Sequence, residues 1–599
     1  MIFWDYVEYR KKFLKPFHKN NERFFVFFMI IKDYYILMHL IFISIMTTIV
    51  YYWIYPALMI ISSLKMDSIT QGLHSGAEDN QQLVVYGGTS AGFTAAIQAA
   101  KSGIDVLLIS SSPHIGGMMV EGLGGSDIDN HAEFQNSPAV SGLALDFYAR
   151  VAQYYNREEE WRLAIKEGKK NPELWRFESS VAESLIADWL EEYDNITIVK
   201  GTRLVEGRGA VMKKGTRIES LLLENGMRVR GDMFVDATYE GDLMAAAGVA
   251  FTVGRESNAT YGETLNGIRG ENTYRQFEVN VNPYLDPEDP GSGLIPTIQD
   301  ERFGHPGEGD DRIQAFCFRM CLTREKSNQL PFAKPKEYDR NQYEIYLRYL
   351  KAGGKLYVPN EKLPNGKTDL GAWHDLSHNL YGMNRGYPTA SYVRRTEIFE
   401  EHKSFTQGLF YFLANDPEVG ELDPELQQKW SSWGLAKDEF TDNEGWPRDF
   451  YVRDGRRMVS DYVITEHHVR KQEYTKVEDP IALAYWPPDV HHVRRIVVNG
   501  FAYNEGFVFG GDNWRPLPIS FRSLIPAADQ CSNLIVPTCP SSSHIAYGAI
   551  RLEWTFMVLG QAAAIMANET LKNGMAVQEL SYDQLLPQIK KAKIVTSLP

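Results

Sequence analysis

The stretch VVYGGTSAG, residues 84–92, ends an apolar run in a glycine-rich turn. In a dinucleotide-binding turn the first glycine makes the tight bend, the second lets the backbone approach a pyrophosphate, and the third lets the next helix pack on the strand. Gly87 and Gly92 occupy the first and third positions, but Thr89 occupies the second. The turn therefore predicts phosphate binding through a weakened motif, in which the hydroxyls of Thr89 and Ser90 could contact the phosphate.

Apolar runs on either side of this turn indicate the elements that would hold it. Residues 81–86 and 104–110 are typical of buried strands, and the alanine-rich residues 90–103 are typical of a helix. A strand, helix and strand with short connections predict a parallel pair in a doubly wound sheet. The second strand ends in Ser110, where an acidic residue normally binds the ribose hydroxyls of NAD, and Asp105 lies at the wrong end. NAD binding is therefore disfavoured.

A glycine pair follows the second strand in the stretch HIGGMM, residues 114–119. Such a pair brings backbone close to a second part of a cofactor, as FAD enzymes require. The sequence GGTSAGFTAAIQAAKSG followed by HIGGM resembles FAD-dependent oxidoreductases of the glutathione-reductase-like superfamily, in the group with GGTxAGxxAAxxAAxxG followed by HLGGM. Threonine at the second glycine position is usual in that group.

The resemblance extends over residues 82–570 through several blocks in the same order. These blocks are VDATYEGDLMAAAGV (235–249), YVRDGRRMV (451–459), WPPDVHH (486–492), PISFRSLIP (518–526) and the stretch from 533 to 567. Two residues depart from the pattern: Ser110 replaces an acid, and Phe521 replaces a frequent tyrosine. The second departure puts in doubt a phenolic hydroxyl in the active site.

The resemblance implies an FAD cofactor and assigns residues along it. Those expected to hold the pyrophosphate are Gly87, Gly88, Thr89, Ala91 and Gly92, with Ser110 near the adenosine ribose. Those expected toward the isoalloxazine are His114, Gly116, Gly117 and Met118, with Asp236 and Thr238 at the end of a neighbouring strand. Those expected to close over the flavin are Ser543, His544, Gly548 and Gln561, where a helix N-terminus can stabilise negative charge on reduced flavin.

Oxidation of a C–H bond by a flavin needs a base for the accompanying proton and cations to orient an anionic substrate. His491 and Asp489 form a D-x-H pair in which the carboxylate could set the imidazole tautomer, although one face of a strand would give the same spacing for structural reasons. We predict a catalytic set of His491, His544, Arg522 and Arg456, and we also consider Asp489, His492 and Arg457. No metal site is predicted, because His374 and Asp375 lack a third ligand at useful spacing.

Residues 34–64 contain no Asp, Glu, Lys or Arg and exceed the ~20 apolar residues that cross a bilayer. Seven basic residues against four acidic ones precede this run, which predicts a cytoplasmic N-terminus and an extracytoplasmic or luminal catalytic domain. The alternative is a soluble protein translated from Met66.

Composition limits the remaining function classes. A formal charge of −15 in 599 residues disfavours nucleic acid as a partner, and four cysteines are too few for a disulfide scaffold. The predicted organisation is a basic tail (1–33), a transmembrane segment (34–64), a linker (65–80), a first FAD-binding part (81–260), an inserted α+β substrate domain (261–500), a second FAD-binding part (501–575) and a tail (576–599). The sequence does not indicate the oligomeric state.

The main functional prediction is an FAD-dependent oxidoreductase that transfers a hydride from a small organic substrate to flavin N5. Two alternatives stay open at this point. One is a flavin enzyme that isomerises or eliminates on a polyhydroxylated substrate without net oxidation, and the other is a membrane-tethered binding protein with a degenerate nucleotide fold.

Overall fold

A parallel sheet lies at the centre of the computed structural model, which describes residues 80–125, 127–130, 135–270, 274–372, 374–510 and 513–598. Its parallel strands, in spatial order, are β3 (Ile196–Lys200), β2 (Val106–Ser110), β1 (Gln81–Tyr86), β6 (Arg228–Asp236) and β20 (Leu534–Ile535). The antiparallel strands β5 (Arg217–Leu222) and β4 (Val211–Lys214) extend the sheet from the first half of β6. The predicted α/β class with a parallel, Rossmann-like core is confirmed.

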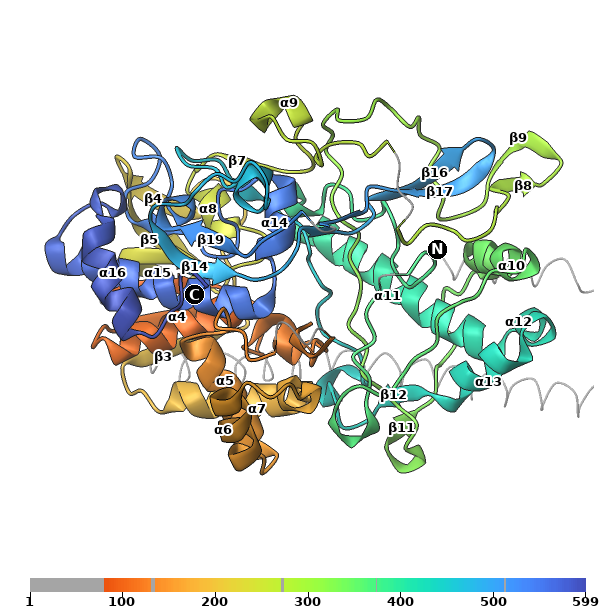
Figure 1. Cartoon of the computed structure of the whole chain (residues 1–599), viewed down its shortest axis with the longest axis horizontal. Coiled ribbons are helices and arrows are strands. Elements are labelled where there is room, and N and C mark those ends of the chain that lie inside the picture. Colours follow the sequence, from red (N-terminus) through yellow and green to blue (C-terminus); the bar gives the residue numbers. More distant parts are fainter. Residues whose placement is uncertain are drawn as a thin grey trace, which may run out of the picture. The chain divides into compact units, whose positions relative to one another are not determined.

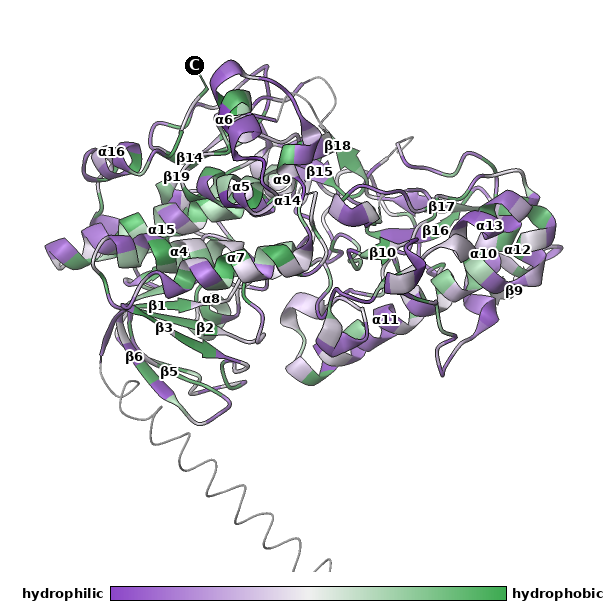
Figure 2. Ribbon diagram, turned by 90° about the horizontal axis from the view of Figure 1, so that it is seen from below, coloured by the Kyte–Doolittle hydropathy of each residue, from purple (hydrophilic) through white to green (hydrophobic). Residues whose placement is uncertain are grey.

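The sequence explains why this sheet is buried on both faces. Leu83 and Val85 of β1 pack in the same apolar cluster as helix α4 (Ser90–Lys101), whereas Val84 and Tyr86 pack in a second cluster on the opposite face. Because both faces are covered, the strands are nearly continuous apolar runs, which is typical of parallel sheets. Figure 2 shows these strands as hydrophobic ribbons beneath α4 and α15.

Helix α15 (Glu553–Asn573) packs directly on α4, so the C-terminal part of the chain completes the layer that begins near residue 90. The approach is close because Gly560 has no side chain, and a Cβ there would overlap the carbonyl oxygen of Ala91. Strand β20 likewise returns beside β6. Ala77–Pro599 forms one compact unit, so the predicted borders near residues 260 and 500 stay predictions.

Residues between β6 and β20 build the green and cyan side of Figure 1, where α11 is the longest helix. The other helices are α5 (Leu143–Tyr154), α6 (Glu158–Glu167), α7 (Ser179–Glu191), α8 (Asp242–Ala246), α9 (Asn258–Tyr261), α10 (Glu344–Lys351), α11 (Tyr392–Asn415), α12 (Pro417–Leu422), α13 (Pro424–Ser432), α14 (His544–Ile550) and α16 (Tyr582–Lys591). The short strands are β7 (Phe251–Thr252), β8 (Tyr284–Asp286), β9 (Asp289–Leu294), β10 (Leu322–Thr323), β11 (Gln329–Leu330), β12 (Gly434–Ala436), β13 (Arg457–Met458), β14 (Pro480–Ala484), β15 (Asp489–Val490), β16 (Arg494–Val498), β17 (Phe501–Glu505), β18 (Val508–Phe509) and β19 (Leu517–Ser520).

The predicted transmembrane segment, residues 34–64, lies outside the described residues. Within the described ranges, no helix combines the length and apolar character needed to cross a bilayer. Membrane attachment and topology therefore stay predictions.

Candidate cofactor site

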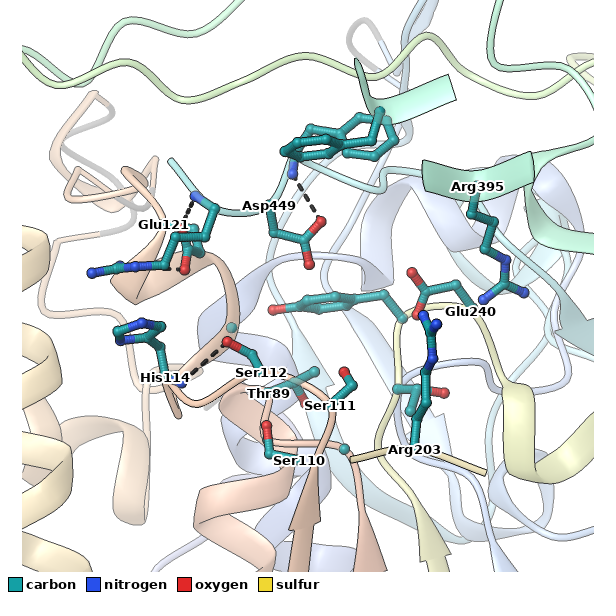
Figure 3. A pocket seen from close by; sticks show the side chains of 18 of the residues that line it. Thr89, Ser110, Ser111, Ser112, His114, Glu121, Arg203, Glu240, Arg395 and Asp449 are labelled. Atoms are coloured by element: carbon teal, nitrogen blue, oxygen red, sulfur yellow. Dashed lines mark hydrogen bonds and ion pairs between the residues drawn. The ribbon is translucent and has the colours of Figure 1, made fainter. Parts of the chain in front are cut away.

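A cavity of about 600 Å³ opens at the carboxyl ends of β1, β2 and β6 (Figure 3). The turn after β1, the residues that follow β2 and the turn after β6 all contribute to its wall. In open α/β sheets, ligands bind at this edge, and cofactor cavities commonly have volumes of about 300–1,000 Å³. The cavity therefore lies where the sequence predicted the cofactor.

Half of the predicted cofactor residues line this cavity. They are Gly87, Gly88, Thr89, Ser110, His114, Gly117, Met118 and Thr238. The predicted residues that are not on its wall are Ala91, Gly92, Gly116, Asp236, Ser543, Gly548 and Gln561, together with the predicted catalytic residues His491, His544, Arg456 and Arg522.

The glycines of the β1–α4 turn are needed because the backbone is crowded there. Gly87 has a φ of +119°, and a Cβ on it would lie 2.5 Å from the carbonyl carbon of Ala237. A Cβ on Gly92 would overlap the carbonyl oxygen of Gly87, so only glycine lets α4 begin this close to the strand. Thr89, the N-cap residue of α4, lines the cavity, so this helix begins at the cavity edge, where a helix N-terminus favours phosphate.

Thr89 has a role that the sequence did not predict. Its Oγ1 caps α4 by accepting a hydrogen bond from Gly92 N at 3.3 Å, and it donates one to Ala237 O at 2.6 Å. Because this hydroxyl is engaged within the protein, it ties the helix start to the end of β6. The predicted contact between the Thr89 hydroxyl and a phosphate is thus not supported.

Polar side chains surround the end of β2. The hydroxyl-bearing residues Ser110–Ser112 follow one another along the wall, and Figure 3 shows Arg203 beside them. His114 lies between two carboxylates, with Nδ1 2.5 Å from Glu183 and Nε2 3.0 Å from Asp442. These hydroxyls and the Arg203 guanidinium stand where an acidic residue would otherwise meet the ribose.

The far wall of the cavity is one face of α11, a helix of the predicted substrate domain. The lining residues of this helix recur every three or four positions: Tyr392, Arg395, Thr396, Phe399, Glu400 and Lys403. Arg395 binds Asp242 through two hydrogen bonds of 2.7 and 2.8 Å. Asp242 also pairs with Arg456 at 2.7 Å, so predicted catalytic Arg456 supports the wall from behind.

Burial controls the charge of several acids on the wall. Burial raises the pKa of Glu121 to about 8, although the positive charge of Arg448 lowers it. Burial and the negative charge of Glu240 together raise the pKa of Asp449 to about 7. Burial would also raise the pKa of Asp242, but hydrogen bonds from Arg395 and Arg456 lower it below its ordinary value. The cavity thus combines an acid whose pKa is lowered, Asp242, with two acids that titrate near neutrality.

Replacing Arg395 by methionine should destabilise the protein by about 3 kcal/mol, because the buried carboxylate of Asp242 loses a bidentate partner. Arg394→Met is the matched control: Arg394 precedes it on α11, is exposed and pairs with Glu397 and Glu401 at the surface. Arg394→Met should lower the free energy of unfolding by less than about 1 kcal/mol, because exposed ion pairs contribute little to stability. Urea denaturation of both variants measures the difference, and equal losses would contradict a structural role for the Arg395–Asp242 pair.

The predicted residues Ser543, His544 and Gly548 are buried and do not line the cavity. Ser543 caps α14 and donates to Glu263 at 2.6 Å, and His544 Nδ1 lies 3.0 Å from Asp454 Oδ2. Gly548 lets α14 pack on β15, since a Cβ there would lie 3.0 Å from the nitrogen of Asp489.

Three predicted residues lie in other structural contacts. Gln561 bridges helices by accepting from Leu143 N and donating to Gln98, both at 2.9 Å. Arg522 has a half-exposed side chain that pairs with Asp479 at 2.7 Å. Asp236 accepts hydrogen bonds from Thr238 and Met244 and so shapes the turn after β6.

His491 lies in a buried polar group formed with Asp489, Arg551 and Tyr451. Its Nε2 is 3.9 Å from Asp489 Oδ1, which is too far for a hydrogen bond. Arg551 instead binds Asp489 and the Tyr451 hydroxyl, at 3.3 and 3.1 Å. Burial and the guanidinium groups of Arg453 and Arg551 hold the pKa of His491 well below its ordinary value, so this imidazole is neutral at pH 7.

Comparison with known proteins gives one match over most of the chain. A family model described as FAD dependent oxidoreductase matches residues 82–589. Comparison with curated proteins gives no match. The family match does not identify the narrower HLGGM group.

Solved structures match only parts of the chain. Thioredoxin reductase from T. acidophilum is 16% identical over 26% of this chain and 34% of its own, with a TM-score of 0.16. THI4 from Thermovibrio ammonificans is 18% identical over 33% of this chain and 71% of its own, with a TM-score of 0.21. The p-nitrophenol 4-monooxygenase PnpA from Pseudomonas putida DLL-E4 is 11% identical over 30% of this chain and 46% of its own, with a TM-score of 0.20. The matched region spans about a third of the thioredoxin reductase, and such low scores do not define the fold of the whole chain.

Proposed function

Because this chain belongs to the FAD-dependent oxidoreductase family, we propose that it oxidises a small organic molecule by transferring a hydride to N5 of the flavin. The observation that supports this proposal most directly is the cavity at the carboxyl edge of the sheet, in which bare glycine backbone and the α4 N-terminus meet polar side chains. When bound, FAD supplies a two-electron acceptor that no amino-acid side chain provides.

The residues around the cavity suit the successive parts of FAD. Gly87, Gly88 and Gly117 line the cavity with backbone alone. A Cβ at any of the three would lie 2.5 Å or less from a neighbouring atom, so no larger residue fits there. Backbone N–H groups at the start of α4 would hold the pyrophosphate, and Ser110–Ser112 with Arg203 would hold the ribose. The face of α11 that lines the cavity would exclude water from the opposite side.

The buried group around Asp489 is suited to orienting a polar substrate. Arg551 and Tyr451 present a guanidinium and a phenol in one hydrogen-bonded unit. His491 is neutral there and can accept a hydrogen bond, but protonating it is costly because two guanidinium groups repel the added charge. We therefore propose His491 as a substrate-orienting residue, with the proton acceptor elsewhere.

Anaerobic mixing of the flavin-loaded protein with panels of alcohols, amines and hydroxy acids tests the proposal. A substrate should bleach the visible flavin absorption, with one substrate oxidised per flavin. A compound that is converted while the flavin ends fully oxidised would overturn net oxidation and favour isomerisation or elimination. Acid precipitation of the same protein shows whether the flavin is released and hence not covalently bound.

A further inference from the structure

A tyrosine on the cavity wall is hydrogen-bonded to a carboxyl group buried behind it. The Tyr239 hydroxyl lies 2.8 and 2.9 Å from the two carboxylate oxygens of Glu553, the first residue of α15. The same hydroxyl accepts a hydrogen bond from Met118 N at 3.0 Å. Glu553 is 1% exposed, whereas Tyr239 and Met118 both line the cavity. Three segments of the chain that are far apart in sequence therefore meet at one hydroxyl.

The hydrogen count at this hydroxyl depends on Glu553. A phenol has one hydrogen to donate, and its oxygen can accept two hydrogen bonds. When Glu553 is ionised, the Tyr239 hydrogen is committed to the carboxylate. When Glu553 is protonated, the carboxyl donates to the tyrosine oxygen, and the phenolic hydrogen becomes available to the cavity.

We propose that Tyr239 exchanges a proton with the bound substrate or flavin and that Glu553 stores this proton behind it. Glu553 is a positioning residue in this pair, because it acts through the tyrosine. The inference rests on the proposed function and supplies the proton acceptor that neutral His491 does not provide.

The surroundings of Glu553 suit a proton store. Burial raises its pKa to about 7, against hydrogen bonds from Ser90 and Tyr239, so both protonation states are accessible near neutral pH. Helix α4 packs on α15 and contributes Ser90, which is uncharged. Tyr451 also interacts with both members of the pair: its charge would raise the pKa of Tyr239, and the charge of Glu553 raises the pKa of Tyr451.

The proposed step balances for an alcohol or amine substrate. The substrate loses its C–H bond as a hydride to the oxidised flavin and its O–H or N–H proton to the Tyr239 oxygen. The tyrosine hydrogen passes at the same time to the Glu553 carboxylate, so tyrosine stays neutral and the glutamic acid becomes neutral. Two electrons and one proton thereby reach the flavin, and the second proton rests on Glu553.

The test measures the midpoint potential of the bound flavin between pH 5.5 and 9 by dye-coupled anaerobic reduction of the flavin-loaded protein. We compare wild type, Glu553→Gln, Tyr239→Phe and Tyr155→Phe. Tyr155 is the matched control: its hydroxyl donates to Glu178 Oε2 at 2.9 Å and accepts from Glu178 N at 3.1 Å, and it does not line the cavity. Glutamine keeps the size of Glu553 and can donate to Tyr239, but it cannot titrate.

We expect the wild-type plot of potential against pH to bend where Glu553 titrates. Glu553→Gln should lose this bend, and Tyr239→Phe should move it to higher pH because the carboxylate loses a donor. Tyr155→Phe should follow wild type, and bends from Glu121 and Asp449 should be common to all four proteins. Parallel curves for wild type and Glu553→Gln would overturn the proposal.

Further outcomes keep the test decisive. If Glu553→Gln retains no flavin, the two tyrosine variants decide, and identical curves for them would overturn the proposal. Because this measurement needs no substrate, a failure to find any oxidised substrate would contradict the proposed function without altering the result for the proton store.

Discussion

Gly92→Val should purify with at most about a tenth of the wild-type flavin content. A loss of about 1.4 kcal/mol of binding free energy weakens binding tenfold, and we expect the displacement of α4 to cost more than that. The reason is steric: even the first carbon of a side chain at Gly92 would overlap the carbonyl oxygen of Gly87. The helix must then shift away from β1, and its N–H groups leave the cavity edge. The ratio of visible flavin absorption to protein absorption measures the occupancy.

Gly291→Val is the matched control for this substitution. Gly291 lies in the exposed hairpin strand β9, where a Cβ would meet only the side chain of Asp289, 3.1 Å away. This variant should retain full flavin content. Circular dichroism separates loss of flavin from loss of fold, and Gly92→Ala provides a smaller perturbation if valine unfolds the protein. Full occupancy in either Gly92 variant would contradict the assignment of the turn.

Local patterns predicted the cofactor edge because strand, turn and helix are adjacent in sequence. The period of the apolar residues and the crowding of Gly92 against Gly87 depend on neighbours within a few residues of one another, whereas Gly87 is crowded by Ala237, which follows β6. The turn after β2 could be predicted because it also directly follows an apolar strand in the sequence, and Ser110 and His114 line the cavity. The fold class could therefore be predicted from local patterns, whereas the individual cofactor residues came from the family resemblance and stay predictions, half of which line the cavity.

The far wall could not be predicted in this way, because it depends on pairs distant in sequence. Arg395 meets Asp242 across 153 positions, and nothing in either local pattern indicates the partner. The signal that could have found the wall is the three- and four-residue spacing of polar and aromatic side chains along α11. Arg522 shows the opposite case: a guanidinium favours anions in general, and here its anion is Asp479 at the surface.

The flavin-free protein should lose stability as pH rises, and Glu121→Gln should reduce this loss. The folded chain holds a proton on Glu121 up to a pKa of about 8, because burial penalises the ionised carboxylate. The unfolded chain releases that proton near the ordinary value of 4.5. Between these values the folded state binds more protons than the unfolded state, so the free energy of unfolding falls as pH rises and levels off above about 8.

The size and direction of this effect make Glu121→Gln a sharp test. If the whole shift counted, the loss would approach about 5 kcal/mol, since each pKa unit is worth about 1.36 kcal/mol. Glutamine keeps an oxygen that can accept from Arg448 N, as Glu121 does at 2.7 Å, but it carries no charge at any pH. The variant should therefore match wild type near pH 4.5 and exceed its stability at pH 8. The buried acids Asp449, Asp236 and Glu553 keep part of the slope, because burial raises the pKa of each.

Urea denaturation of the flavin-free proteins across this pH range measures the difference. Glu219→Gln, at an exposed position of β5, serves as the control and should reproduce the wild-type curve. A Glu121→Gln curve parallel to wild type would mean that Glu121 is ionised in the folded chain at neutral pH. The cavity would then carry one more negative charge beside the cofactor, and the pairing of Glu121 with Arg448 would have to outweigh its burial.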